Sequence, residues 1–465
     1  MLGATSGDNA ARVAGSFRDP AGYVFQRGDN IYRAVTRYGA ADYAAAKMAG
    51  IFQWLCDEGR LVRILHEQPG TNENAIILEV ERLPWITHPY EWSFQLLKIA
   101  ALFHLDLHLA LLEKGFTLSD ATAYNVQFVG PNPIFIDHLS IRPYRDGEFW
   151  TGHRQFCEQF LNPLLLRACL AVPHNAWYRG SMEGIAVSDL AKILPFSKKL
   201  SWNALTNIVL QDKFQAGTSS KERKFSVKER KLPKQAFTAM LRQLRNWISR
   251  LQPADKKKTV WADYSLVNTY NDAEREAKHN FIAEYVRSAG PKTVIDLGCN
   301  TGEYSERALV SGATSVVGFD YDVQALDRAY ENATARNLNL LPLFLDARNP
   351  SPSQGWMGTE RLGFGERMKA DGLLALAFEH HLAIAHNVPL EQLIQWLLLV
   401  APTGVIEFVP KSDPTVQRML ALRDDIFPNY EVQEFERILA THSVIERREV
   451  VSQSGRTLFQ FRRNY

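Results

Sequence analysis

The stretch Thr293-Val-Ile-Asp-Leu-Gly-Cys-Asn-Thr-Gly-Glu-Tyr304 decides how the second half of the chain is expected to fold. Its first five residues are apolar or β-branched except for Asp296, as in a buried parallel strand. Gly298 and Gly302 follow, and a helical pattern begins at about Tyr304. A strand, a glycine turn and a helix N-terminus bring backbone close to a ligand. The two glycines stand four residues apart, which does not match the G-x-G-x-x-G fingerprint of dinucleotide-binding proteins.

Strand and helix patterns alternate regularly from this stretch to the C-terminus, which predicts an α/β, doubly wound sheet. Seven strands are expected: Thr293–Leu297, Ser315–Asp320, Leu341–Asp346, Asp371–Leu376, Val405–Val409, Ser443–Val450 and Arg456–Arg463. The helices expected around them are Asp272–Ser288, Val323–Arg336, Leu390–Leu399 and Thr415–Arg423. The last two strands are joined through residues 452–455, so the sheet should end in a hairpin rather than a crossover.

The D-x-G-x-x-x-G pattern of Asp296, Gly298 and Gly302 resembles motif I of the class I S-adenosylmethionine (SAM) methyltransferases. Their Rossmann-like fold also resembles the expected seven strands with a terminal hairpin. Ligands of such a sheet bind beyond the carboxyl ends of the strands. The resemblance therefore implies SAM as cofactor, with these binding residues: Asp296, Gly298, Asn300, Gly302, Tyr304, Asp320, Tyr321, Asp346, Ala347 and Ala377.

Two of the acids in this set have specific expected contacts with the cofactor. Asp320 ends the second strand, where a carboxylate accepts hydrogen bonds from both hydroxyls of a ribose. Asp346 ends the third strand, where the family places an acid facing the adenine amine. An acid at a strand end is weak evidence alone, since Asp is common in turns. Three acids in register with one glycine turn form a much stronger pattern.

The methyl acceptor is expected over the fourth strand, next to the cluster Glu379-His380-His381. Glu379 or His380 is a candidate catalytic base that removes a proton from an acceptor hydroxyl. In the alternative interpretation, His381 and Leu382 pack inward and only one of the three faces the pocket. Methyl transfer from a sulfonium needs little more than in-line positioning, so a strong base is not required. The N-P-P-Y/F tetrapeptide of amino- and base-methylating enzymes is absent from the sequence.

Four further segments together resemble a bacterial family of nodulation host-specificity (NoeA-like) methyltransferases, over roughly residues 261–465. They are Asn349–Trp356, Ala375–Pro389, Glu407–Asp413, and the lead-in with Trp261, Tyr264 and Tyr270. The nodulation name suggests a small-molecule or glycan substrate, methylated on a hydroxyl or phosphate of a glycan or lipo-oligosaccharide. Tyr264 and Tyr270 would either close over the cofactor or pack on the sheet.

A second constellation lies in the first half of the chain, where Asp120 and Asn125 are five residues apart and Asp137 follows 12 residues later. This spacing resembles a kinase catalytic loop and its D-F-G aspartate, and the resemblance implies an α+β kinase-like lobe over residues 17–251. Asp120 would be catalytic and orient a hydroxyl, while Asn125 and Asp137 would hold Mg²⁺ on the phosphates of ATP. One helix is expected over Asp42–Cys56 and another over Trp92–Leu112.

This second constellation departs from the kinase pattern at several positions. Ser119 and His138 replace the usual catalytic-loop and D-F-G neighbours, and the strand Asn30–Thr36 carries Arg33 but no lysine. Arg does not replace Lys conservatively at a phosphate site, because its fork has another reach and geometry. A pseudokinase lobe, or an unrelated α/β domain with acids in turns, therefore stays open.

Length and composition set the remaining expectations. The 465 residues predict a tail over 1–16, the kinase-like domain over 17–251, a linker over 252–260 and the methyltransferase domain over 261–465. The net charge of +2 argues weakly against nucleic acid as a partner. Four dispersed cysteines and the lack of an 18-residue apolar window favour a protein of the reduced cytoplasm without a membrane span. The alternatives are an RNA or protein methyltransferase with a targeting module, and a SAM-sensing scaffold without activity.

Overall fold

A computed structural model describes residues 11–71, 74–199, 231–255, 272–421 and 424–464. The chain forms two compact units, and each takes a short segment from the sequence span of the other. Unit 1 is Met1–Tyr90, Leu97–Lys256 and Ser353–Leu362; unit 2 is Glu91–Leu96, Lys257–Pro352 and Gly363–Tyr465. The lead-in residues Trp261, Tyr264 and Tyr270, most of the expected tail and half of the expected linker lie outside the described residues.

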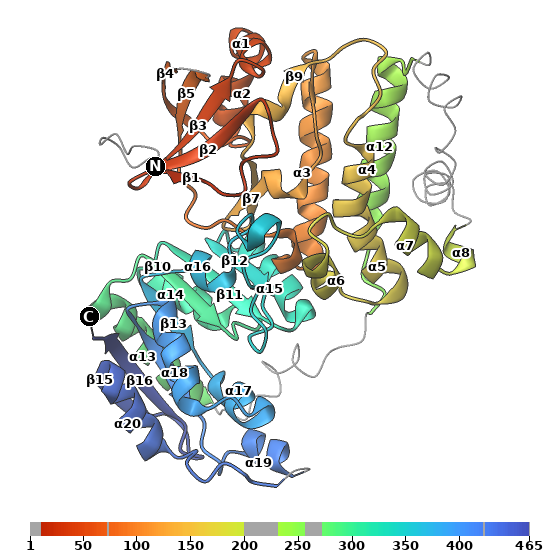
Figure 1. Cartoon of the computed structure of the whole chain (residues 1–465). Coiled ribbons are helices and arrows are strands. Elements are labelled where there is room, and N and C mark those ends of the chain that lie inside the picture. The colour runs from red at the N-terminus through yellow and green to blue at the C-terminus, as the bar shows by residue number, and fades with distance from the viewer. Residues whose placement is uncertain (1–10, 72–73, 200–230, 256–271, 422–423, 465) are drawn as a thin grey trace. The chain divides into compact units, whose positions relative to one another are not determined.

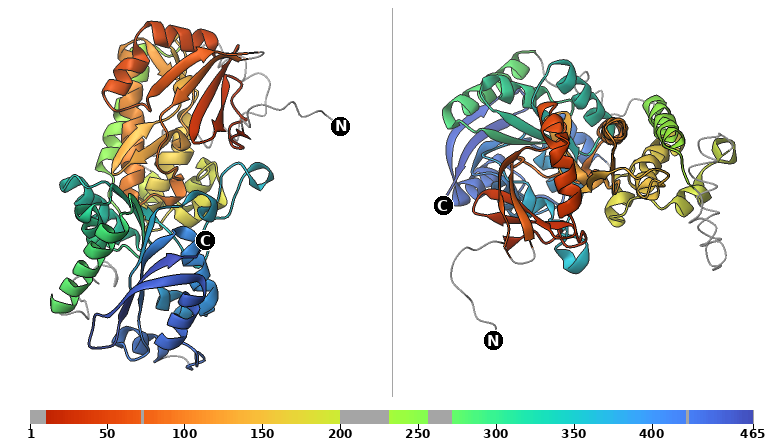
Figure 2. Two further views of the ribbon diagram at one scale, coloured as in Figure 1. Left: turned by 90° about the vertical axis from the view of Figure 1, so that its left-hand side faces the viewer. Right: turned by 90° about the horizontal axis from the view of Figure 1, so that it is seen from above.

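Unit 2 contains a seven-stranded mixed sheet in the order β12-β11-β10-β13-β14-β16-β15. The strands are β10 (Thr293–Leu297), β11 (Ser315–Asp320), β12 (Leu340–Phe344), β13 (Gly372–Ala375), β14 (Thr403–Phe408), β15 (Ser443–Val450) and β16 (Thr457–Arg463). Neighbouring strands from β12 to β14 are parallel, and β16 is antiparallel to both β14 and β15. The predicted sheet and its terminal hairpin, blue in Figure 2, are confirmed.

Helices cover the apolar strands of this sheet, as near-continuous hydrophobic runs require. They are α13 (Asp272–Ala289), α14 (Glu303–Ser311), α15 (Val323–Ala335), α16 (Phe364–Arg367), α17 (Glu379–His386), α18 (Leu390–Val400), α19 (Pro414–Leu420) and α20 (Val432–His442). Helix α13 packs on α14, and α18 packs on α20 (Figure 1). The core between strands and helices includes Val294, Leu374 and Val405, all fully buried. The strand ends are thereby fixed to one edge of a rigid layer.

Unit 1 begins with a five-stranded antiparallel sheet in the order β1-β2-β3-β5-β4. Its strands are β1 (Ala11–Arg12), β2 (Gly22–Arg27), β3 (Asn30–Thr36), β4 (Ile64–Pro69) and β5 (Asn74–Val80). The single helix expected over 42–56 is wrong: the chain forms α1 (Ala40–Met48) and α2 (Ile51–Asp57). Gly50 separates them with φ of +69°, a conformation that ends a right-handed helix.

The rest of unit 1 is mainly helical: α3 (Phe94–Glu113, of which Leu97–Glu113 belongs to this unit), α4 (His153–Phe156), α5 (Asn162–Leu170), α6 (Asn175–Gly180), α7 (Val187–Ile193), α8 (Phe196–Lys199) and α12 (Lys234–Arg250). Two small sheets pair β6 (Phe116–Leu118) with β9 (Ile141–Pro143), and β7 (Val126–Val129) with β8 (Asn132–Phe135). Among the described residues α3 is the one helix long and apolar enough to cross a membrane, and 61% of its apolar window is buried, as in a core helix. The kinase-like character of this unit stays a prediction.

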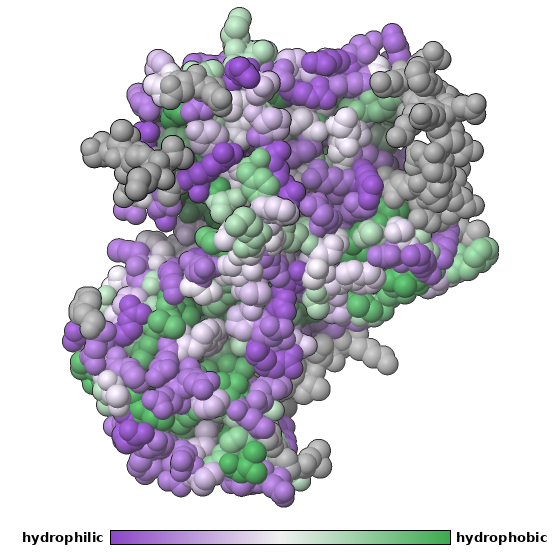
Figure 3. Space-filling view, in the orientation of Figure 1, coloured by the Kyte–Doolittle hydropathy of each residue, from purple (hydrophilic) through white to green (hydrophobic). Residues whose placement is uncertain are grey.

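On the face drawn in Figure 3, hydrophilic areas are interspersed with smaller apolar areas. The net charge of the whole chain is only +2.

Candidate functional site

A cavity of about 370 Å³ opens over the carboxyl ends of the parallel strands of unit 2. Residues that follow β10, β11, β12 and β13 line it, together with Lys278 of α13 and part of α17. Strand β10 lies between β11 and β13, so the chain crosses to opposite sides of the sheet at this point. Such a switch point is where open α/β sheets bind ligands, and the volume suits a small organic molecule.

The turn after β10 has the backbone that the glycine spacing predicts. Gly298, Asn300 and Gly302 have φ of +81°, +50° and +87°, and Gly302 caps the N-terminus of α14. The turn is held by hydrogen bonds from Gly298 N to Phe319 O (2.8 Å) and from Asn300 N to Asp320 Oδ2 (2.8 Å). A Cβ on Gly298 would lie 3.3 Å from the ring of Phe378. The glycine therefore keeps open the space between this turn and the segment after β13.

Eight of the ten predicted cofactor-binding residues line this cavity: Gly298, Asn300, Tyr304, Asp320, Tyr321, Asp346, Ala347 and Ala377. The other two lie behind it. Gly302 begins α14, and Asp296 is buried, where its Oδ2 accepts a 2.6 Å hydrogen bond from the Ser305 hydroxyl. Burial raises the pKa of Asp296 to about 7. Its place beneath the turn supports a structural part in holding the site together.

Asp320 presents its carboxylate at the end of β11. Its Oδ1 accepts from Asp322 N and its Oδ2 from Asn300 N, each at 2.8 Å. Burial raises the pKa of this carboxyl from 3.8 to about 6, although these backbone donors act in the opposite direction. The two hydrogen bonds from backbone amides fix the direction of the carboxylate. Its oxygens can therefore accept hydrogen bonds from two hydroxyl groups of a ligand in the cavity.

Asp346 lies two residues beyond β12, which ends earlier than expected. Both of its oxygens accept from Arg348, at 2.7 Å for Nε and 2.9 Å for Nη2. The guanidinium of Arg348 lies 5.0 Å from the ring centroid of Tyr321. All three residues line the cavity, so an acid, a cation and an aromatic ring converge at its β12 end.

The predicted catalytic pair Glu379 and His380 is fully buried and does not line the cavity. Glu379 Oε1 accepts from the hydroxyl of Tyr430 (2.6 Å) and from Val409 N (2.7 Å), and His380 Nδ1 lies 3.0 Å from Glu379 Oε2. His381 and His386 line the cavity instead. One of the three residues, His381, therefore faces the cavity together with Leu382, and roles for Glu379 and His380 stay predictions.

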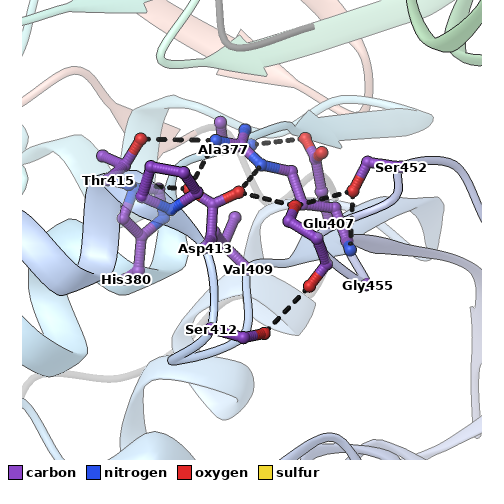
Figure 4. Close-up of polar contacts among 12 residues, drawn as sticks. Ala377, His380, Glu407, Val409, Ser412, Asp413, Thr415, Ser452 and Gly455 are labelled. Atoms are coloured by element: carbon purple, nitrogen blue, oxygen red, sulfur yellow. Dashed lines mark hydrogen bonds and ion pairs between the residues drawn. The ribbon is translucent and has the colours of Figure 1, made fainter.

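The sequence predicted no site role for two buried residues, Lys278, which lines the cavity, and Glu407, which is paired with it. The side chains of Lys278 in α13 and Glu407 in β14 are 1% and 0% exposed, and their Nζ and Oε2 atoms are 2.8 Å apart. Glu407 Oε2 also accepts from Ala377 N at 2.8 Å, and Figure 4 draws Ala377 and Glu407 among the polar contacts there. A glutamate inside the apolar run 405–409 was the available signal; its partner lies 129 residues away.

In unit 1 the structure brings together the three residues of the kinase-like constellation. Asn125 Nδ2 lies 3.3 Å from Asp120 Oδ2 and 3.3 Å from Asp137 Oδ2. Arg33 Nη1 donates to Asp137 Oδ1 at 2.6 Å. Burial first, then the charges of Asp137 and Asp19, raise the pKa of Asp120 to about 7. Among the described residues no group of three or more His, Cys, Asp and Glu is placed to hold a metal ion, so Mg²⁺ binding here stays a prediction.

Comparison with known proteins gives a relative that matches nearly the whole chain and others that match a short part of it. The nodulation protein NoeA of Rhizobium meliloti (strain 1021) is 50% identical over 460 residues, which cover 97% of this chain and 96% of that protein. The ribosomal protein L11 methyltransferase of Histophilus somni (strain 2336) is 44% identical over 64 residues, 14% of this chain and 22% of that protein. No family model matches.

Among solved structures, the N-methyltransferase NodS from Bradyrhizobium japonicum WM9 is 14% identical. The likeness covers 42% of this chain and 99% of that one, with a TM-score of 0.32. A score this low does not bear on function.

Proposed function

This chain belongs to the family of the nodulation protein NoeA, and from that premise we propose that it is a methyltransferase that uses SAM. One observation carries the proposal: residues after four neighbouring parallel strands, chosen from the sequence as cofactor-binding, line a single cavity. The local likeness to a ribosomal protein L11 methyltransferase supports methyl transfer as the reaction.

The residues present fit SAM at three points. Gly298 has a positive φ, and a Cβ there would lie only 3.3 Å from Phe378, so the glycine leaves a cradle that a side chain would fill. Asp320 is oriented by two backbone donors and accepts the ribose hydroxyls. Asp346 and Tyr321, at the β12 end of the cavity, are an acid and a ring suited to an adenine. We assign the adenosine to this end of the cavity.

When bound, SAM supplies an electrophilic methyl group on a sulfonium. The chain contributes orientation: the glycine turn and the Ala377 segment, with φ of +48°, limit the positions open to the acceptor. His381 lines the acceptor side, and burial, aided by the neighbouring His380 and His386, lowers its pKa to about 3. The ring is therefore neutral at pH 7, and a pKa this low makes it a weak base, so we assign His381 to positioning the acceptor rather than to proton removal. We propose a hydroxyl or phosphate of a glycan or lipo-oligosaccharide as the acceptor.

Calorimetry with SAM tests the cofactor assignment. Asp320→Ala should weaken binding by about 100-fold or more, because two hydrogen bonds to a charged group, each worth about 1.5–3 kcal/mol, are lost. Gly298→Val should abolish binding by strain and by filling the cradle. Glu331→Ala, an exposed acid on α15, is the matched control and should bind as the wild type does. Unchanged affinity in both site variants would remove the cofactor from this site.

The acceptor requires a separate experiment. Glycans extracted from cells with and without the gene would be compared by mass spectrometry for a difference of one methyl group. The Asp320→Ala gene is the control, since it should give the same spectrum as the deletion. A methylated RNA or protein in place of a glycan would support one alternative; SAM binding without any methylated product would support a sensing scaffold.

A second function, in unit 1, is favoured by the convergence of Asp120, Asn125 and Asp137. We propose that this unit is a kinase-like domain that recognises or phosphorylates the same substrate. Transfer of the γ-phosphate of ATP to a glycan pool, in the presence of Mg²⁺, should disappear in Asp137→Ala. The pair between Arg33 and Asp137 suggests that recognition is the simpler role, since a guanidinium already faces that carboxylate. Absence of transfer in the wild type would leave recognition alone.

A further inference from the structure

The cavity of unit 2 has two chemically different ends. Strand order runs from β12 and β11 through β10 to β13 and β14. Asp346 and Tyr321 mark the first end, and Lys278, Tyr304 and Ala377 mark the other. If the adenosine occupies the first end, as proposed above, the methionine part of SAM must extend toward the second. That part carries an α-carboxylate and an α-ammonium.

Lys278 is placed to meet the carboxylate. Among the described residues that line the cavity, Lys278 and Arg348 are the lysine and the arginine, and Arg348 belongs to the other end, beside Asp346. Lys278 enters from the apolar face of α13, one turn before the buried Ile282. Its ammonium also lies 4.8 Å from the ring centroid of Tyr304. Lys278 is 1% exposed, lines the cavity and is paired with Glu407, so its ammonium is within reach of an anionic group bound in that cavity.

The energetics of the pair with Glu407 favour the same conclusion. Burial lowers the pKa of Lys278, while the charge and hydrogen bond of Glu407 act to raise it. The desolvation of two buried charges often exceeds their mutual attraction, so such a pair is weak evidence for a purely stabilising role. A second carboxylate, brought by a ligand, would add attraction for the ammonium, whose three N–H groups allow it to bridge two acids.

We propose that Lys278 binds the α-carboxylate of SAM, and that Glu407 is the positioning residue that holds both the ammonium of Lys278 and the backbone of Ala377. This inference rests on the proposed function and deepens it. Glu407 Oε2 joins α13 to the segment after β13 through its two 2.8 Å contacts. The residue that recognises the cofactor and the segment that faces the acceptor are therefore fixed by one carboxylate.

The test compares SAM with decarboxylated SAM, which lacks only the α-carboxylate, by calorimetry on the full chain. The wild type should bind SAM at least about tenfold more tightly than the decarboxylated compound, since a charge-assisted contact contributes about 1.5–3 kcal/mol. Lys278→Met should lose this preference and bind the decarboxylated compound nearly as the wild type does. Lys278→Arg should keep part of the preference, because the positive charge is retained.

Two further variants keep the outcome clear. In Lys278→Met the carboxylate of Glu407 is buried without a partner, and the double variant Lys278→Met/Glu407→Gln removes that charge. The double variant therefore tests the preference for SAM over decarboxylated SAM in a protein without an unpaired buried charge. Lys369→Met, an exposed lysine on unit 2, is the control and should leave the preference unchanged. Equal weakening of both compounds in the Lys278 variants would overturn the inference while SAM binding stands. Failure of the wild type to bind either compound would overturn the proposed function as well.

Discussion

The carboxyl of Asp320 should make cofactor affinity depend on pH. Burial raises its pKa from 3.8 to about 6 in the chain without ligand. The ionised form is the better acceptor for two ribose hydroxyls, so affinity for SAM should fall as pH falls through 6, by about tenfold per unit below it. Above pH 7 the group is ionised and affinity should level off. Calorimetry between pH 5 and 8 measures this, and a flat profile in the wild type would contradict it.

Asp320→Asn supplies the control for this pH profile. The amide cannot ionise, so its weaker affinity should not change through pH 6. A slope that persists in this variant would have to come from another group, such as Asp296, whose pKa burial raises to about 7.

Glu379 should contribute mainly to stability. Glu379→Ala leaves the backbone amides of Val409 and His380 without their carboxylate acceptor, while the Tyr430 hydroxyl keeps the carbonyl of Val409 at 2.8 Å. Each buried unsatisfied donor costs about 1–3 kcal/mol, so the free energy of unfolding should drop by about 3 kcal/mol. Tyr430→Phe removes one donor and should cost about 1 kcal/mol. Urea unfolding measures both, and a fully stable Glu379→Ala chain with no methyl transfer would instead restore its catalytic role.

Individual side chains show where sequence reasoning stops. The glycine turn and Asp320 were predictable, because local spacing and a strand end determine their positions. The Asp346–Arg348 pair was not, since the strand ends at Phe344 and a turn aims the acid at its own neighbour. Lys278 and Glu407 lie 129 residues apart, and only the sheet order brings them together.

The turn between β10 and α14 should need glycine at position 302 for the stability of the protein. In Gly302→Ala the new Cβ would lie 2.7 Å from Cδ2 of Leu340, a core residue that is 1% exposed, and φ of +87° adds strain. Gly290→Ala is the matched control, because φ is +63° but no atom lies within 4 Å. We expect a loss of about 1 kcal/mol for Gly290→Ala from strain alone, and about 1–3 kcal/mol more for Gly302→Ala. Urea unfolding with equal losses would show that Leu340 yields without cost.

Secondary structure was predictable where the hydrophobic pattern was long and regular. The strand Thr293–Leu297 was predicted residue for residue, because each end is marked by the change from an apolar run to Gly or Lys and Pro. The helix expected over 42–56 failed at Gly50, where the apolar pattern continues but the backbone turns to positive φ. Periodicity therefore located the elements, while backbone conformation at single glycines decided their breaks.

For the chain as a whole, the exchange of two short segments could not be read from the sequence. Residues Glu91–Leu96 belong to unit 2, and Ser353–Leu362 belong to unit 1. Each segment is short and carries no motif that predicts its partners. In unit 1, Glu360 accepts from Arg18 at 2.6 and 2.9 Å, across 342 residues of sequence. The predicted domain boundary at a single linker therefore gives the order of the two units along the chain, but it does not give the residues that each unit contains.

This exchange predicts that residues 257–465 alone are less stable than unit 2 in the full chain. The fragment lacks Glu91, which forms a buried ion pair with Arg367, and Gln95, whose N donates to Asp327 Oδ1 at 3.0 Å. Loss of one partner of a buried pair costs about 3–5 kcal/mol. The rate of hydrogen exchange at the backbone amides of β13 and β14 measures the stability of unit 2 in the full chain and in the fragment. This rate should be higher in the fragment. Glu91→Gln in the full chain should show part of this increase in exchange rate, because the charge is lost but the segment is kept. Equal protection of these amides in all three proteins would show that Glu91–Leu96 does not support the core of unit 2.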